Sequence, residues 1–220
     1  MIFEPSYPDG SFVSSRKGSS NWTAIAKGRS AHVGRDFQNG RNALTALARF
    51  LLAAENLTNH EKGITVNVGS IEGGSPVNIV PDLAVGKFNI RVIEAQDLEI
   101  LTKELYKLTE EASKEEGIAI SLHANENNPP KPFDAKQKTL FNSVNSCAVT
   151  LGMQMHWKPS GGACDGSRLY AAGLPNIDTL GVIGGQIHTS HEYVELDSLT
   201  KRAQLTALFL MQLASGRMFK

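Results

Sequence analysis

Four short stretches in the first half of the chain alternate between apolar and polar residues. A period of two residues places every second side chain on one face of a β-strand, so each stretch predicts a half-buried strand. The apolar positions are Trp22, Ala24 and Ala26, then Ile64, Val66 and Val68, then Ala84, Phe88, Ile90 and Val92, and finally Ile118, Ile120 and Leu122.

Two stretches between these strands repeat their apolar residues every three or four positions, which is the spacing of one face of an α-helix. Asn39 or Asn42 is a suitable N-cap for the first helix, and Gly117 is a suitable stop for the second. The order is therefore strand, helix, strand, strand, helix, strand. This order predicts a ferredoxin-like βαββαβ domain, with an antiparallel sheet that carries both helices on one face.

The remainder of the chain has a different pattern. Residues 1–18 are rich in turn formers and predict a loop, and the prolines around Pro130 predict a stiff connector. Beyond the connector, helices and strands alternate, which indicates a parallel or mixed α/β sheet. We expect helices at 135–151 and 198–214, the second capped by Asp197 or Ser198, and a short helix that ends at Ala172. We expect strands at 153–157 and 177–183.

Composition narrows the possible partners. Lys plus Arg and Asp plus Glu both number 22, so no basic surface for nucleic acid is indicated. No apolar run approaches the roughly 18 residues that a membrane-spanning helix needs. Two cysteines, Cys147 and Cys164, do not make a disulfide framework, and we read Cys164 as a small filler and not a nucleophile. A cytoplasmic location is expected, with a periplasmic or secreted mature form left open.

The segment from Gly184 to Tyr193 is the strongest candidate for chemistry. A glycine pair follows an apolar run, and His188 and then Glu192 follow the glycines. A histidine on a turn beside a carboxylate suits a metal ligand, and the alternative is a histidine on a surface loop. The block resembles the C-terminal signature of the M20 family of metallohydrolases, which has a glycine pair, a zinc-binding histidine and Glu-Tyr before the last helix.

The resemblance implies the fold and the domain limits. Residues 1–17 correspond to the end of an N-terminal catalytic segment and a linker. Residues 18–126 correspond to the inserted lid, or dimerisation domain, of the family. Residues 127–220 correspond to the C-terminal part of an α/β zinc-peptidase catalytic domain.

The resemblance also implies a metal site that is incomplete in this chain. Family members bind two Zn²⁺ ions in each active site, and Glu4 in Phe-Glu-Pro and His188 match two of the family's ligands. No His-x-Asp motif occurs, and no Glu-Glu pair stands where the family has its general base. We therefore expect the chain to be the C-terminal portion of such an enzyme, inactive alone.

Further motifs match the family's substrate-binding residues. His32, in Gly-Arg-Ser-Ala-His-Val-Gly, matches the lid histidine that stabilises the oxyanion, although a histidine that merely ends a strand is the simpler interpretation. Asn78 in Asn-x-x-Pro matches an asparagine that holds substrate, and Arg91 matches a strand arginine suited to a carboxylate. Gly161 and Gly162 match a turn that lines the substrate pocket.

The function implied is hydrolysis of an amide bond next to a free carboxylate, as in glutamate carboxypeptidases. The substrate would be a small N-acyl or peptide amino acid, and the protein would form a homodimer through the lid. The alternative is a non-catalytic dimerisation or regulatory protein built on the lid. In that case the open sheet face or an edge strand would mediate a two-fold contact.

Overall fold

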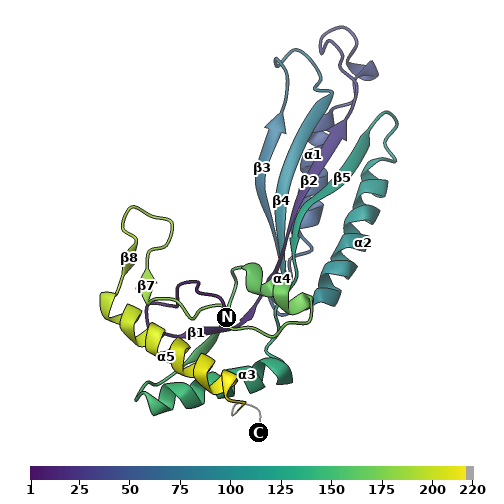
Figure 1. Cartoon of the computed structure of the whole chain (residues 1–220). Helices are drawn as coiled ribbons and strands as arrows, with labels where there is room; N and C mark the ends of the chain where they lie inside the picture. Colours follow the sequence, from purple (N-terminus) through teal and green to yellow (C-terminus); the bar gives the residue numbers. More distant parts are fainter. Residues whose placement is uncertain (217–220) are drawn as a thin grey trace. The chain divides into compact units, whose positions relative to one another are not determined.

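The computed structural model describes residues 1–216, and the chain forms two compact units (Figure 1). Unit 1 combines Met1–Lys17 with the chain from Pro130 onward, and unit 2 is Gly18–Pro129. Among the described residues, every helix is too short or too polar to cross a membrane.

Unit 2 is an antiparallel sheet with two helices on one face, as the sequence pattern predicts (Figure 1). The strands lie in the order β3-β4-β2-β5, so β3 and β5 are the edges. Both helices pack against the same face of this sheet. The elements are β2 (Gly18–Lys27), a short 3-10 helix (Phe37–Asn39), α1 (Ala43–Glu55), β3 (Thr65–Gly73), β4 (Leu83–Val92), α2 (Ala95–Ala112) and β5 (Ala119–Asn128).

The core of unit 2 fills the space between the sheet and its helices. Trp22 of β2 and Phe88 of β4 stack with their ring centroids 6.4 Å apart, and Leu47 of α1 is fully buried beneath them. A Cβ atom on Gly86 would lie 2.7 Å from a methyl of Leu51, so a larger residue here would force the Leu51 side chain of α1 to shift. Alternation along the strands thus buries one sheet face and leaves the other open.

Unit 1 contains a small parallel strand pair and three helices. Its elements are β1 (Phe12–Arg16), α3 (Ala135–Thr150), β6 (Trp157–Ser160), α4 (Asp165–Ala171), β7 (Gly184–Gly185), β8 (Tyr193–Val194) and α5 (Leu196–Ala214). β1 pairs with β6, and β7 pairs with β8 in a separate antiparallel hairpin. Phe12, Phe141 and Leu205 lie at the centre of its core, which joins β1 to α3 and α5.

Several predicted boundaries in unit 1 are wrong. Residues 12–16 form a strand inside the predicted loop, because the flanking turn residues hide a strand of only five residues. The strand expected at 153–157 starts only at Trp157. The run at 177–183 forms isolated bridges to Phe3 and Ser6 and no continuous strand.

Two predicted ends also differ from the structure. α5 starts at Leu196 after Glu195, and neither Asp197 nor Ser198 caps it. The Ser198 hydroxyl instead accepts from the Ile183 N–H and donates to the Glu195 carbonyl. β5 continues to Asn128, into the predicted connector, because its last residues pair with Ser19 and Ser20 of β2. At α1, in contrast, Asn42 caps the helix by accepting from the Thr45 N–H, as predicted.

Candidate functional site

Three of the predicted site residues line one pocket of unit 1. Glu4, Gly162 and His188 surround a cavity of about 500 Å³, together with Tyr7, Arg16 and other residues of the N-terminal segment. These residues come from segments that are far apart in the sequence, and they meet because the N-terminal segment bridges to Thr179 and Ile183. Gly161 belongs to the same turn but does not line the cavity.

His188 lies on the loop that connects β7 to β8. Its backbone has φ of 67°, and Gln186 has φ of 54°, so two non-glycine residues hold the left-handed conformation. The His188 N–H donates to a carboxylate oxygen of Glu192 at 3.3 Å. Such strain in a short loop is typical of functional sites, where surrounding contacts fix an unfavourable backbone.

The glycine pair before His188 lies in a short strand and not in a turn. Gly184 and Gly185 form β7, and neither has a positive φ. A Cβ atom on Gly184 would lie 2.4 Å from the Tyr193 carbonyl oxygen, and one on Gly185 would lie 2.8 Å from the Tyr193 ring. The pair is therefore required by the close approach of Tyr193, which closes the hairpin that carries His188.

A buried ion cluster lies behind the Gly162 side of this pocket. Asp178 is fully buried and accepts from Arg16 Nε at 2.7 Å and Nη2 at 3.1 Å, and from Lys131 Nζ at 2.6 Å. Arg16 Nη1 also donates to the Gly162 carbonyl at 2.9 Å. The cluster therefore holds the turn that lines the pocket, and it places two cations around one carboxylate.

The charges in this cluster shift each other's pKa values. Burial acts to raise the pKa of Asp178, but the hydrogen bond from Arg16 and the charge of Lys131 outweigh it and hold that pKa below its usual range. Burial lowers the pKa of Lys131, and the attraction of Asp178 offsets this only in part. The ion pairs are thus strongly coupled and sit away from water.

Cys164 belongs to the same cluster. Its thiol donates to Asp178 Oδ2 at 3.1 Å and its sulfur accepts from the Gly166 N–H, so it caps α4. Burial, aided by the negative charge of Asp178, raises the pKa of this thiol to about 11. A thiol with so high a pKa is almost entirely protonated near neutral pH and is a poor nucleophile.

The sequence patterns considered above do not predict this ion cluster. Asp178 interrupts an apolar run between Ile177 and Leu180, and a lone charge in such a run is a signal of a paired buried group. Lys131 stands among prolines in a segment that looks solvated, and nothing in its sequence neighbourhood distinguishes it. Arg16 lies in the strand that was itself missed.

The described residues do not complete a metal centre by themselves. Residues 1–216 contain no group of three or more His, Cys, Asp or Glu side chains arranged to hold a metal ion. Glu4 and His188 line the same pocket and offer one oxygen and one nitrogen donor. A zinc site requires three or four protein ligands, so these two donors alone do not fit the ion.

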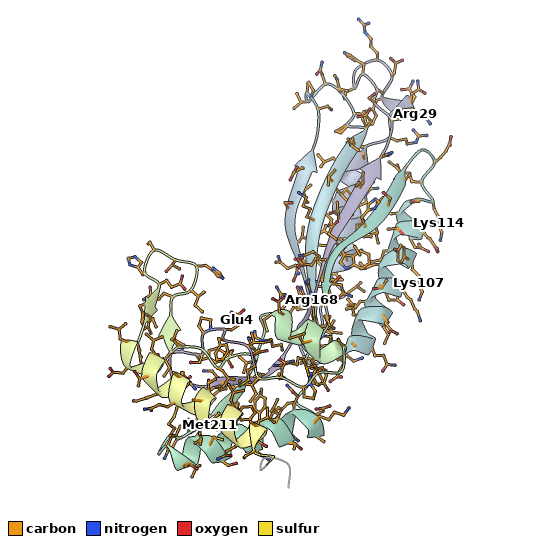
Figure 2. The ribbon with its side chains drawn as sticks, viewed as in Figure 1. Glu4, Arg29, Lys107, Lys114, Arg168 and Met211 are labelled. Carbon is orange, nitrogen blue, oxygen red and sulfur yellow. The ribbon has the colours of Figure 1, made fainter. Side chains whose placement is uncertain are left out.

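His32 and Asn78 meet at one end of the sheet of unit 2. The Val33 N–H donates to the Asn78 carbonyl at 2.9 Å, and His32 pairs with Ile79 in an isolated bridge. Arg29, labelled in Figure 2, begins this loop just beyond β2 and is exposed. His32 Nδ1 accepts from the Gly34 N–H at 3.1 Å, so the neutral ring carries its proton on Nε2. Nε2 is then the donor available to a substrate oxygen.

Arg91 lies at the opposite end of the same sheet. It pairs in register with Ser19 of β2, whereas His32 follows the end of that strand beyond Lys27. The eight steps along the strand from Ser19 to Lys27 span roughly 26 Å at a rise of about 3.3 Å per residue. A small substrate therefore cannot touch His32 and Arg91 of one unit at once.

Comparison with known proteins identifies the middle of the chain. Residues 14–117 match the model of a family described as a peptidase dimerisation domain. Over 194 residues the chain is 23% identical to carboxypeptidase G2 of Pseudomonas sp., covering 86% of this chain and 46% of that protein. The chain spans about half the length of the curated relatives it matches.

Solved structures have the same fold. Aminopeptidase PepT of Bacillus cereus superposes with a TM-score of 0.80 at 25% identity, over 93% of this chain and 54% of PepT. The YXEP protein of Bacillus subtilis, described as a dinuclear metal binding peptidase from the M20 family, has a TM-score of 0.72 at 17% identity. That match covers 97% of this chain and 56% of the YXEP protein, and at this identity it supports the fold alone.

Proposed function

We propose that this chain, which carries the peptidase dimerisation domain of the M20 family, is the dimerising and substrate-binding part of an amide hydrolase. The reaction is hydrolysis of an amide bond next to a free carboxylate, in a small N-acyl or peptide amino acid. The observation that carries the proposal is the pocket of unit 1, where Glu4, Gly162 and His188 line one cavity. Glu4, Gly162 and His188 belong to three sequence motifs that are far apart along the chain, and they line one cavity because of the fold.

Glu4 and His188 are proposed to supply two ligands of a dinuclear zinc centre. A zinc ion in such a centre acts as a Lewis acid and activates water. The remaining ligands and the general base would come from residues outside these 220, in keeping with the half-length coverage of the relatives. The buried Arg16–Asp178 pair would keep Gly162 in place beside these two ligands.

His32 and Asn78 are proposed to act together on the substrate. With its proton on Nε2, His32 is a donor suited to the oxygen that gains negative charge during hydrolysis. The Asn78 side-chain amide offers a donor and an acceptor to the substrate amide. Because Arg91 lies at the other end of the sheet, we assign it to a carboxylate of a different substrate molecule, in a homodimer with two sites.

The dimer is expected to form through β3, the more apolar edge of the sheet. Ile71 of β3 is 47% exposed and Leu52 of the neighbouring α1 is 62% exposed. β5, at the other edge, carries His123, Asn125 and Glu126, and polar or charged residues on an edge oppose pairing. We predict that Ile71→Lys weakens self-association at least about 100-fold, because a two-fold axis brings the two new charges close together.

Sedimentation equilibrium of the whole chain measures this effect. Ser121→Lys places the same charge on the opposite edge and is the matched control. We expect the wild type and Ser121→Lys to be dimers and Ile71→Lys to be a monomer. A dimer that survives Ile71→Lys and dissociates with Ser121→Lys would assign the contact to β5 instead.

A further inference from the structure

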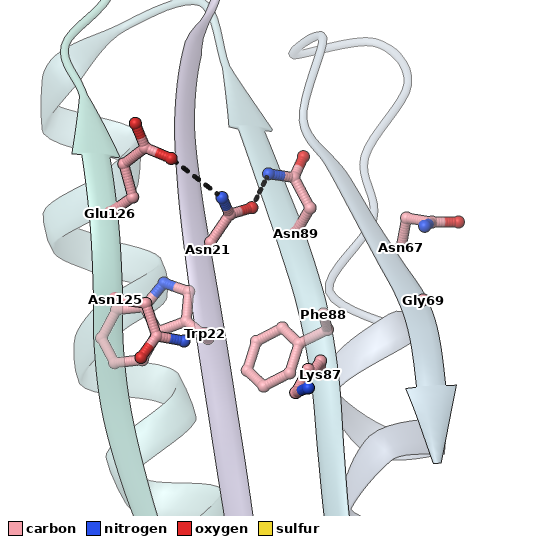
Figure 3. Close-up of a pocket in the computed structure, with 9 residues that line it drawn as sticks. All are labelled: Asn21, Trp22, Asn67, Gly69, Lys87, Phe88, Asn89, Asn125 and Glu126. Atoms are coloured by element: carbon pink, nitrogen blue, oxygen red, sulfur yellow. Dashed lines mark hydrogen bonds between the residues drawn. The ribbon is translucent and has the colours of Figure 1, made fainter. Parts of the chain in front are cut away.

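The open face of the sheet in unit 2 carries a row of three amide side chains and one carboxylate that crosses all four strands. Asn89 of β4 pairs in register with Asn67 of β3 and with Asn21 of β2, and Asn21 pairs with Glu126 of β5. Figure 3 shows these side chains on the face away from the helices. Alternation alone predicts polar residues here, but it does not explain four hydrogen-bonding groups in a single register.

Three hydrogen bonds in series lead from Arg91 through the row to Glu126. Arg91 Nε donates to Asn89 Oδ1 at 2.8 Å, and Asn89 Nδ2 donates to Asn21 Oδ1 at 2.7 Å. Asn21 Nδ2 then donates to Glu126 Oε2 at 3.4 Å. Asn89 Nδ2 also lies 3.1 Å from the Ser19 hydroxyl oxygen and 3.3 Å from the Ser20 carbonyl oxygen, and both contacts further fix its direction.

The groups at the two ends of this series, Arg91 and Glu126, determine which atom donates and which accepts in each of the three hydrogen bonds. A guanidinium can only donate, so Asn89 must present its carbonyl oxygen to Arg91 and its NH₂ group to Asn21. An ionised carboxylate can only accept, so Asn21 must present its NH₂ group to Glu126. The two ends therefore require the same orientation of both amides, and neither amide can flip without losing a bond.

We propose that Asn89, oriented through Asn21 by Glu126, is a positioning residue that fixes the guanidinium of Arg91. The importance of this position rests on the proposed function, in which Arg91 binds a substrate carboxylate. The bond from Nε to Asn89 fixes the plane in which the guanidinium can meet a carboxylate. A guanidinium held in this way loses less rotamer entropy when it binds an anion.

The sheet is irregular on both sides of this row. The row lies in a hollow of about 650 Å³, and Arg91 reaches this row through Asn89 without lining the hollow itself. Gly69 is left out of the β3–β4 register, and Asn125 is the extra residue of a bulge between β5 and β2. The bulge lets consecutive residues Asn125 and Glu126 both line the hollow, and bulges of this kind re-aim side chains near functional sites.

Asn89→Ala tests the proposal, with Asn67→Ala as the matched control. Asn67 stands in the same register row, beside Asn89, and has no part in the three bonds that lead to Glu126. Asn89→Asp keeps the oxygen that accepts from Arg91 and is the conservative rescue. The readouts on the whole chain are the exchange rate of the Arg91 Nε–H by ¹⁵N NMR and the affinity for N-acetyl-L-glutamate.

Asn89→Ala should speed exchange of the Arg91 Nε–H at least about tenfold, since one charge-assisted hydrogen bond is lost. The affinity for N-acetyl-L-glutamate should fall by roughly five- to tenfold for the same reason. Asn89→Asp should restore slow exchange, and Asn67→Ala should leave the exchange rate at its wild-type value. Unchanged exchange in Asn89→Ala, or an equal change in Asn67→Ala, overturns the proposal. A third outcome separates the two proposals: the wild-type chain does not bind N-acetyl-L-glutamate, but Asn89→Ala still speeds exchange of the Arg91 Nε–H. This outcome would support the positioning role of Asn89 and contradict carboxylate binding by Arg91.

Discussion

Asp178→Ala is expected to destabilise unit 1 by about 3–5 kcal/mol, because it leaves Arg16 and Lys131 as buried cations without their carboxylate. Removing one partner of a buried ion pair costs much more than the pair contributes net, since the remaining charge keeps its desolvation penalty. The loss should also release Gly162, whose carbonyl oxygen accepts from Arg16. Urea denaturation followed by the fluorescence of Trp157 in β6 measures the change.

The pH dependence of this effect has a definite sign. The pKa of Asp178 is lowered in the folded chain, so its stabilisation is complete above the usual aspartate pKa of about 3.9 and is lost as pH falls through the lower folded value. The variant should therefore lose less stability than the wild type in acid. Lys158→Ala, which removes the exposed ion pair with Asp9, is the control and should change the midpoint far less than Asp178→Ala does. A wild-type midpoint in Asp178→Ala would contradict the account of the cluster.

His32→Ala should lower kcat about 10²- to 10³-fold in a complete hydrolase that contains this chain, because one oxyanion donor is removed. KM should change little, since the donor acts mainly on the charge that develops in the transition state. Steady-state kinetics with an N-acyl amino acid measures both constants. His32 is exposed and contributes little packing, so the fold should persist.

His60→Ala is the matched control for this variant. His60 lies in the turn before β3 and belongs to neither candidate site. It should retain wild-type kcat and KM. A His32→Ala enzyme within about threefold of the wild type would show that the Nε2 donor is not used, because loss of an oxyanion donor costs far more than that.

The fold of unit 2 was predictable because its signals are local and agree with each other. Alternation in β2 and β4, helical spacing in α1 and the Asn42 cap all specify the same arrangement. Unit 1 was harder to predict because its strands are short and pair with distant segments. β1 has five residues and finds its partner β6 more than a hundred residues later, so no local pattern marks it.

The candidate site was predictable only in part. Motif resemblance selected Glu4 and His188, and the structure places both on one pocket. The same reasoning grouped His32 with Arg91, which the strand register places at opposite ends of a sheet. The Asn89 row was missed because each asparagine lies on a different strand, and only the register aligns them.

The most direct test of the central claim is the zinc content of the purified 220-residue chain after exposure to zinc and desalting, beside His188→Ala. Two donors hold zinc weakly, so almost no zinc should remain on either protein. This result would support the account that these 220 residues do not complete a zinc site by themselves. Near-stoichiometric zinc that disappears in His188→Ala would contradict the account, because this chain would then complete a metal site alone or in its dimer.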